Sequence, residues 1–176
     1  MKDYREKAKA GDEDALMELG WCMFQNEMFV ETIEMLDNYE PDKDHFFDYC
    51  NLYGRCAIAG EMYEKALDYL IKWNKLITEL VDDGSEKYKK RIRRLAYSYY
   101  PIACCTAILA QKSTFKADFE TRQKMFRMSE ENMKKAIEFE KDEREVYHYK
   151  ERLAYLYTKN EYPNEAIEIC SEIIKK

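Results

Sequence analysis

The chain has 176 residues, of which 46% are apolar and 36% are charged, and its formal net charge is −6. This length fits one domain or one continuous array of repeats, and the apolar content is enough to build a core. Only 5 glycines and 3 prolines leave few places for tight turns, so the composition disfavours a strand-rich fold and favours long helices.

Apolar residues recur at spacings of three and four along most of the chain, which predicts an all-helical fold. Gly11 can end a first short helix, and Asp12 or Asp14 can cap the next one. Pro101 is expected to kink or split a long helix, because proline removes a hydrogen bond and clashes one turn back. The predicted helices cover residues 2–10, 12–25, 28–38, 43–59, 62–82, 86–112, 115–140, 143–159 and 163–175. In helix 115–140 the residues expected to point inward are Phe119, Met125, Phe126, Met133, Ala136, Ile137 and Phe139.

A repeat is visible when the helices are aligned. Leu19-Gly20 and Tyr53-Gly54 lie 34 residues apart, and Leu153-Ala154 follows 100 residues later, which is about three periods. The same offsets then reach equivalent residues in each copy. Three residues after the small residue come Met23, Ala57 and Tyr157, and twelve residues after it come Thr32, Ala66 and Ala166. One helical hairpin cannot bury its own apolar face, so such copies are expected to stack.

This pattern resembles the tetratricopeptide repeat, with a small residue where two helices cross, aromatic residues around it and an alanine in the second helix. The resemblance is best in RLAYLYTKNEYPNEAIEICSEII (152–174) and GRCAIAGEMYEKALDYL (54–70), and AKAGDEDALMELGWCMF is also similar to the Sel1-like repeats. It implies a single all-α domain over residues 1–176, a right-handed α-α superhelix of about four antiparallel helix pairs. The implied units are about 12–40, 43–83, 86–141 and 143–176, the third with lengthened helices.

In the tetratricopeptide family, the first helix of each pair lines a concave groove that holds an extended peptide or a helix. The resemblance therefore implies a protein–protein interaction module, such as an adaptor, a scaffold or a chaperone-like protein, with a protein or peptide partner. Alternatively, Trp21 packs against helix 2–10 and Tyr155 belongs to the core. Carried over residue by residue, the groove positions are Met17, Trp21, Phe24, Gln25, Asn51, Arg55, Ile58, His148, Glu151, Tyr155 and Lys159.

The sequence offers no pattern typical of an enzyme. Its two histidines, His45 and His148, have no serine, cysteine or aspartate partner at a known spacing, and no nucleotide-binding or HExxH motif occurs. The six cysteines form no CxxC pair and lie at no metal-ligand spacing to a histidine, so they are expected to be free thiols. We therefore predict no catalytic residue, no metal site and no cofactor.

The charge is distributed unevenly. Residues 1–84 carry 9 basic and 20 acidic side chains, whereas residues 85–176 carry 20 basic and 15 acidic ones. Six basic residues fall within residues 87–94, and tyrosines follow them. On one continuous helix, one face would hold the basic patch of Lys87, Lys90, Arg91 and Arg94.

This stretch supports an alternative function, a nucleic-acid-binding or regulatory protein that uses residues 85–101. A solvated helix face, or an acidic protein partner for it, explains the same run without nucleic acid.

Two further expectations concern location and assembly. No run reaches the roughly 18 apolar residues of a membrane span, and the N-terminus lacks the apolar segment of a signal peptide, so the chain is predicted to be cytoplasmic and to have no membrane partner. No polar capping helix follows the last amphipathic helix. Because that helix can then expose Ile167, Ile169 or Ile173, a homodimer through it is possible.

Overall fold

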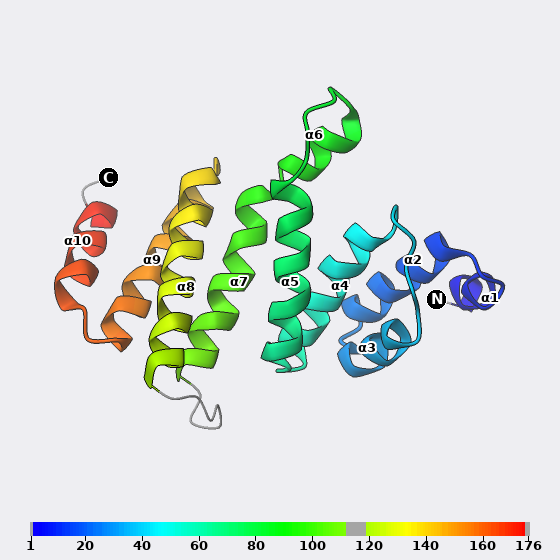
Figure 1. Cartoon of the computed structure of the whole chain (residues 1–176), viewed down its shortest axis with the longest axis horizontal. Helices are drawn as coiled ribbons and strands as arrows, with labels where there is room; N and C mark the ends of the chain where they lie inside the picture. The colour runs from blue at the N-terminus through cyan, green and yellow to red at the C-terminus, as the bar shows by residue number, and fades with distance from the viewer. Residues whose placement is uncertain (1, 112–118, 175–176) are drawn as a thin grey trace. The chain divides into compact units, whose positions relative to one another are not determined.

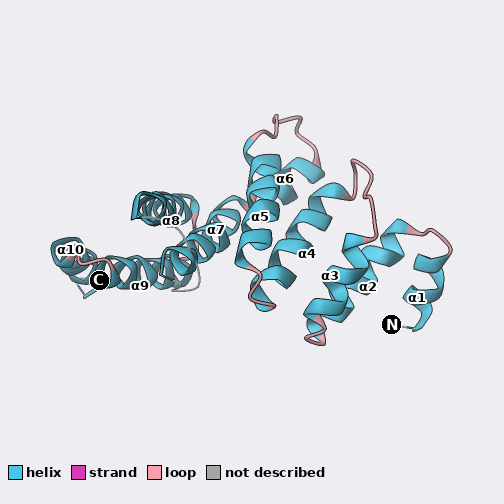
Figure 2. Cartoon of the chain, turned by 60° about the horizontal axis from the view of Figure 1, so that its bottom comes forward, coloured by secondary structure: helices cyan, strands magenta, loops and turns pink. Residues whose placement is uncertain are grey.

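A computed structural model describes residues 2–111 and 119–174, and every regular element in these ranges is an α-helix (Figures 1 and 2). The predicted all-α class is confirmed for this part of the chain. The helices are α1 (Lys2–Lys9), α2 (Glu13–Gln25), α3 (Phe29–Asp37), α4 (Phe46–Ala59), α5 (Tyr63–Thr78), α6 (Glu86–Ile92), α7 (Leu95–Gln111), α8 (Phe119–Phe139), α9 (Glu143–Lys159) and α10 (Pro163–Ile174).

The chain divides into two compact units, residues 1–76 and 77–176. The first unit holds α1 to α4 and most of α5, and the second holds α6 to α10. The single superhelical domain predicted from the sequence concerns both units together, and it stays a prediction.

The turns inside three helical hairpins share one backbone geometry. Glu27, Glu61 and Glu161 adopt positive φ angles of 60°, 57° and 64°, at the 34- and 100-residue spacings of the sequence repeat. In each turn the third residue after the helix end donates its N–H to the carbonyl five residues earlier. These bonds join Met28 to Met23, Met62 to Ala57 and Tyr162 to Tyr157. The repeat spacing is therefore present in the folded backbone as well as in the sequence.

Small residues allow two close helix crossings in the first unit. A β-carbon at Gly54 of α4 would lie 2.7 Å from Leu70 Cδ2 of α5, and one at Gly20 of α2 would lie 2.6 Å from Leu52 Cδ2 of α4. Real β-carbons do not approach heavy atoms this closely, so a side chain at either position would displace the facing leucine at the present helix separation. The crossing inferred for Gly54 from the repeat is confirmed.

Tyrosines fill the space between α4 and its neighbours in the first unit. The rings of Tyr53 and Tyr69 stack at 3.8 Å between centroids, and Tyr49 contacts both at 5.9 and 5.7 Å. The Tyr53 hydroxyl donates to Asp37 Oδ1 at 2.6 Å, which connects α4 to α3. Burial raises the pKa values of Tyr49 and Tyr53, so both stay neutral and act as hydrogen-bonding core residues.

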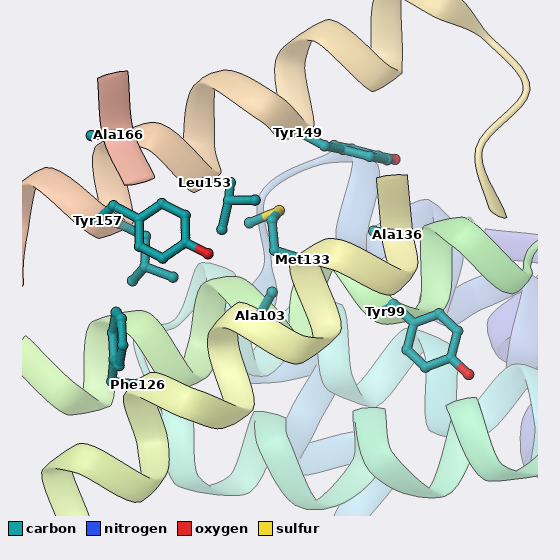
Figure 3. Packing of buried hydrophobic residues seen from close by; sticks show 10 residues of the cluster. Tyr99, Ala103, Phe126, Met133, Ala136, Tyr149, Leu153, Tyr157 and Ala166 are labelled. Atoms are coloured by element: carbon teal, nitrogen blue, oxygen red, sulfur yellow. The ribbon is translucent and has the colours of Figure 1, made fainter. Parts of the chain in front are cut away.

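The second unit is organised around α8, which packs against both α7 and α9. Figure 3 shows the core that these helices share. Ala103 comes from α7, Met133 and Ala136 come from α8, and Tyr149 and Leu153 come from α9. The inward positions Phe126, Met133 and Ala136 are thus confirmed. Phe119 and Phe139 were expected inside but are exposed, Phe119 by 77%, because they stand at the two ends of α8.

The predicted long helix 86–112 is interrupted, but not at Pro101. A turn at Arg93 and Arg94 separates α6 from α7, and Pro101 lies inside the continuous helix α7. The two helices on either side of the break differ in burial. Helix α6 buries no residue, whereas α7 buries Ile102, Ala103 and Leu109 among others. We attribute the tolerance of proline to this packing, because tertiary contacts can offset its local cost of about 3 kcal/mol.

Substitution of Gly54 by leucine should destabilise the fold. The added side chain would overlap Leu70, so the free energy of unfolding should fall by roughly 1–3 kcal/mol. Chemical denaturation followed by circular dichroism measures the change. Ala59→Leu places the same side chain at an exposed position of α4 and should leave stability nearly unchanged. Equal stability of Gly54→Leu and the native chain would contradict the close crossing.

Candidate binding site

A pocket of about 290 Å³ lies in the second unit between α7, α8 and α9. Its floor is apolar, with Met133 of α8 and Leu156 of α9 buried below it. Ser129 on the floor donates its hydroxyl to the carbonyl of Ala103 at 2.7 Å, so its hydrogen is already used. The lining residues are Tyr100, Cys104, Ala107, Ile108, Gln111, Ser129, Met133, Arg152, Tyr155 and Leu156.

The rim of the pocket is aromatic and basic. Tyr155 of α9 is 54% exposed and Arg152, one turn earlier, is also exposed. The Lys159 ammonium lies over the Tyr155 ring, 5.4 Å from its centroid. An exposed aromatic residue beside two cations, above an apolar floor, suits a ligand that carries an apolar group and an anionic group.

Tyr100 connects α7 to α9 at one side of the pocket. Its ring stacks on Tyr149 with 4.6 Å between centroids, and its hydroxyl lies 2.9 Å from Nε2 of His148. Burial raises the pKa of Tyr100 to about 12, although the nearby Arg152 opposes this shift. The phenol therefore stays neutral at physiological pH and holds the two helices together.

The groups in the pocket are not activated for nucleophilic chemistry. Burial raises the pKa of the Cys104 thiol, whereas a catalytic cysteine needs a lowered pKa. The His148 imidazole faces the Tyr100 hydroxyl and not a serine or cysteine. Neither side chain therefore has the environment of an activated nucleophile–base pair.

The structure brings together part of the groove predicted in the last hairpin. Tyr155 lines the pocket, His148 bonds to the pocket residue Tyr100, and Lys159 contacts Tyr155. Glu151 is exposed on the same helix but does not line the pocket. The sequence analysis missed Tyr100 and Cys104, because the irregular spacing of residues 86–140 gave no repeat positions there. It also missed Arg152, since the position carried over on α9 was its neighbour Glu151.

In the first unit, two predicted groove residues are in the core. Met17 and Asn51 are buried, so their assignment to an open groove surface is wrong. Asn51 instead accepts a hydrogen bond from Arg55 Nε at 3.0 Å and orients that guanidinium. Helical periodicity alone could not separate the inner face from the face that packs on the neighbouring helix, since the two faces adjoin on each first helix.

The other predicted residues of the first unit remain accessible. Trp21 and Phe24 are half-buried and their rings meet edge to face at 5.9 Å, while Gln25 is exposed. Arg55 and Ile58 of α4 are also half-buried. These residues belong to unit 1–76 and the pocket belongs to unit 77–176, so one groove that includes both sets stays a prediction.

The basic patch does not form one helix face. Lys87, Lys90 and Arg91 lie on α6, but α6 ends at Ile92 and Arg94 lies in the following turn. The predicted shared face for Arg94 is therefore wrong, because the helix on which it depended is interrupted. Nucleic-acid binding through residues 85–101 stays a prediction.

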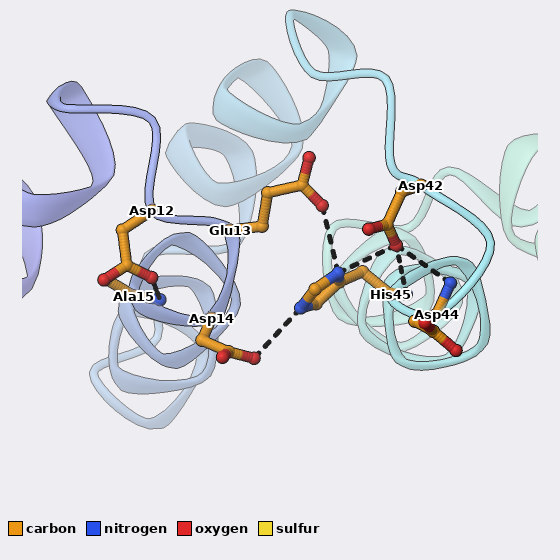
Figure 4. A network of polar contacts seen from close by, with 7 residues as sticks. All are labelled: Asp12, Glu13, Asp14, Ala15, Asp42, Asp44 and His45. Atoms are coloured by element: carbon orange, nitrogen blue, oxygen red, sulfur yellow. Dashed lines mark hydrogen bonds and ion pairs between the residues drawn. The ribbon is translucent and has the colours of Figure 1, made fainter.

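Figure 4 shows a polar cluster that the sequence analysis did not find, between the start of α2 and the start of α4. His45 Nε2 lies 2.9 Å from Asp14 Oδ1, while Nδ1 lies 2.9 Å from Asp42 Oδ1 and 3.0 Å from Glu13 Oε2. Bonds to Asp14 and Asp42 raise the pKa of His45 to about 9. The imidazole is therefore charged at neutral pH and connects both elements electrostatically.

Glu13, Asp42 and His45 also have the donor types of a metal site, and their ligand atoms lie within 4.8 Å of one another. However, both ring nitrogens already face carboxylates, and two backbone N–H groups bond to Asp42 Oδ1 at 2.8 Å. A protonated histidine explains this geometry without a metal. No sequence motif indicates the cluster, since His45 and Asp14 are 31 residues apart.

Comparison with protein-family models, with curated proteins and with solved structures found no match. Functional inference therefore rests on the residues and geometry of this chain. Among the helices of the described ranges, none combines the length and the apolar character that a membrane crossing requires.

The His45 cluster should make stability depend on pH. The histidine pKa is about 9 in the folded chain and about 6.5 when unfolded. The stabilisation is therefore complete below pH 6.5 and is lost as the pH rises to 9. Because Asp14 and Asp42 are largely exposed, we expect about 1 kcal/mol after solvent screening.

Urea unfolding of the native chain and of His45→Gln at pH 6 and at pH 9.5 measures this effect. The stability difference between the two proteins should be larger at pH 6 and should nearly vanish at pH 9.5. A difference that is the same at both pH values would contradict a charged His45 in the folded state.

Proposed function

We propose that the protein is a non-catalytic interaction module of the tetratricopeptide type, an adaptor, scaffold or chaperone-like protein of the cytoplasm. It binds a peptide segment or a helix of a partner protein along the first helices of its hairpins. The observation that carries this proposal is the pocket between α7, α8 and α9, which combines an apolar floor with Arg152 and Tyr155 at its rim.

The size of the pocket supports a side chain as the occupant. Sites for drug-sized ligands and cofactors span about 300–1,000 Å³, and this pocket has about 290 Å³. One bulky apolar side chain of a peptide would fill the floor over Ala107, Met133 and Leu156. The rest of the peptide would then extend along the helix surface, where Tyr155 is available as a contact.

The charge of the rim supports an acidic group next to that apolar anchor. Arg152 presents a planar guanidinium that can bind a carboxylate with two hydrogen bonds, and Lys159 adds a second cation on the same helix. Tyr100 and His148 brace this side of the pocket through their bond of 2.9 Å. A preorganised wall lowers the entropic cost of binding.

The repeated hairpin geometry is the second support. The left-handed residues Glu27, Glu61 and Glu161 give three hairpins the same turn, and a stacked array presents its first helices on one face. On this proposal, Trp21, Phe24, Gln25, Arg55 and Ile58 form a further contact surface within the first unit. Glu151 lies beside the site and favours partners that are not uniformly acidic.

Selection from a phage-displayed random peptide library tests this function. Peptides selected on the native chain should carry an apolar residue near an acidic one. Their affinity should fall about tenfold or more for Arg152→Ala and for Tyr155→Ala, because each removes a central contact of the rim.

Arg144→Ala is the matched control, since it removes an exposed arginine from the first turn of the same helix. It should leave the affinity within twofold of the native value. Failure to select any peptide, or equal binding by all three variants, would contradict the proposed site.

A further inference from the structure

Another pocket of about 290 Å³, here called the Phe139 pocket, lies in unit 77–176 where the start of α7 meets the end of α8. These two helices follow each other in the chain and pack against each other, so the two ends come together (Figure 1). The end of α6 and the turns after α6 and α8 complete its walls. The lining residues are Ile92, Arg93, Leu95, Ala96, Phe139, Glu140 and Lys141.

The aromatic wall of this pocket is Phe139. Its ring stacks on Tyr99 of α7, with 5.9 Å between centroids and 17° between planes, and the Lys135 ammonium lies 5.4 Å from the Tyr99 centroid. Phe139 itself is 42% exposed, so a ring that Tyr99 supports still presents apolar surface to solvent. Ile92 and Leu95 add half-buried aliphatic walls. A flat aromatic group can therefore stack here.

The charged groups of the Phe139 pocket are mainly basic. Arg93 in the turn after α6 and Lys141 in the turn after α8 are both exposed. In the described part of the chain, neither side chain forms an ion pair with a carboxylate. The acidic residue of the lining is Glu140, whose Oε1 accepts the N–H groups of Lys141 and Asp142 at 2.8 and 3.0 Å. Two cations thus accompany one carboxylate that is held by a turn, and the pocket suits an anionic ligand.

An exposed aromatic ring beside two cations matches the chemistry of a nucleotide, which joins a flat base to a phosphate. The ring of Phe139 can stack on the base, while Arg93 and Lys141 can neutralise the phosphate. The small volume fits one base, because a base is similar in size to an aromatic side chain.

Helix α6 favours a strand of several nucleotides over one phosphorylated group. Its Lys87 and Lys90 are exposed, and the helix leads directly into Ile92 and Arg93 of the pocket. Seven helical residues span about 10 Å, so this basic row can meet more than one phosphate. A phosphotyrosine side chain or a free nucleotide presents its phosphate at one place only and would leave the row unused.

Two of the tyrosines that follow the basic run are used inside the protein. Tyr99 is only 8% exposed and supports Phe139. Tyr100 stacks on Tyr149 and lies 2.9 Å from His148 through its hydroxyl. Neither ring is open to a base on both faces, so Phe139 supplies the exposed ring of this pocket.

We propose that the Phe139 pocket binds single-stranded nucleic acid, with one base stacked on Phe139 and the neighbouring phosphates on Arg93, Lys141 and the lysines of α6. The binding tolerates any sequence, because every base has a face that can stack. The site shares no residue with the pocket proposed for a peptide, so either can be present without the other.

Fluorescence anisotropy of a labelled single strand of twelve thymidines, titrated with the full chain, tests this inference. At low salt the dissociation constant should lie at roughly 1–100 µM, and the logarithm of affinity should fall with that of salt with a slope of about −2, as for three phosphates. The same strand paired with its complement should bind at least fivefold more weakly. Its bases are already stacked, although the duplex carries more charge.

Substitutions separate stacking from charge. Phe139→Ala should weaken binding about tenfold and leave the salt slope unchanged, because it removes a ring and no charge. Arg93→Ala and Lys141→Ala should each weaken binding and make the slope less steep by about 0.7. Phe139→Tyr keeps the ring and should bind within twofold of the native chain. This variant distinguishes lost stacking from a loss of folding, which circular dichroism also monitors.

Phe119→Ala and Lys124→Ala are the matched controls, since both residues are exposed near the opposite end of α8. Both should bind like the native chain. A native chain that binds no single strand at 500 µM, or that binds the duplex more tightly, would overturn the proposal. Equal losses for Phe119→Ala and Phe139→Ala would place the site elsewhere and overturn it. Tighter binding of a phosphotyrosine peptide or of AMP than of the strand would overturn it as well, because the ligand would then be a single phosphorylated group.

Discussion

At Gly54 the backbone of α4 lies so close to Leu70 of α5 that an added β-carbon would meet Leu70 Cδ2 at 2.7 Å, and at Gly20 it would meet Leu52 Cδ2 at 2.6 Å. The lack of a side chain at these two positions lets neighbouring helices of the first unit approach closely. Between α4 and α5 the rings of Tyr53 and Tyr69 stack, and Tyr49 meets Tyr69 edge to face. A larger residue at the crossing would separate these rings.

The pocket of the second unit depends on a similar constraint. Its walls come from α7 and α9, which are separated in the chain by the whole of α8. Met133 of α8 and Leu156 of α9 form its buried floor, and Tyr100 of α7 stacks on Tyr149 of α9 at one side. The binding surface is thus a property of hairpin stacking, and no short segment of the sequence contains it.

The sequence predicted the helices well where neighbouring residues alone determine a helix end or a turn. Asp12 caps α2 by accepting the N–H of Ala15 at 2.9 Å, Gly11 takes a positive φ of 90°, and α9 has the predicted bounds Glu143–Lys159. The small residues of the repeat also predicted the crossing at Gly54. These features depend on residues that are neighbours in the sequence or on the spacing of the repeat. They can therefore be predicted without a structure.

Features that depend on which side chains are buried in the folded protein could not be predicted from the sequence. The interruption at Arg93 and Arg94 follows from the difference in burial between α6 and α7, whereas the sequence analysis gave the local effect of Pro101 more weight. Met17 and Asn51 were assigned to the wrong face of their helices for the same reason. The contact of His45 with Asp14 joins distant residues through a loop whose course no motif encodes.

The lack of buried residues in helix α6 has a consequence for local unfolding of the protein. It buries none of its residues, so its unfolding exposes little apolar surface and costs little free energy. Amide hydrogens of Glu86–Ile92 should accordingly exchange with solvent faster than those of α7. Helix α6 and the turn after it contain six basic residues within positions 87–94, each a cleavage site for trypsin. Limited proteolysis should therefore begin here and release the two parts of the chain before either part unfolds.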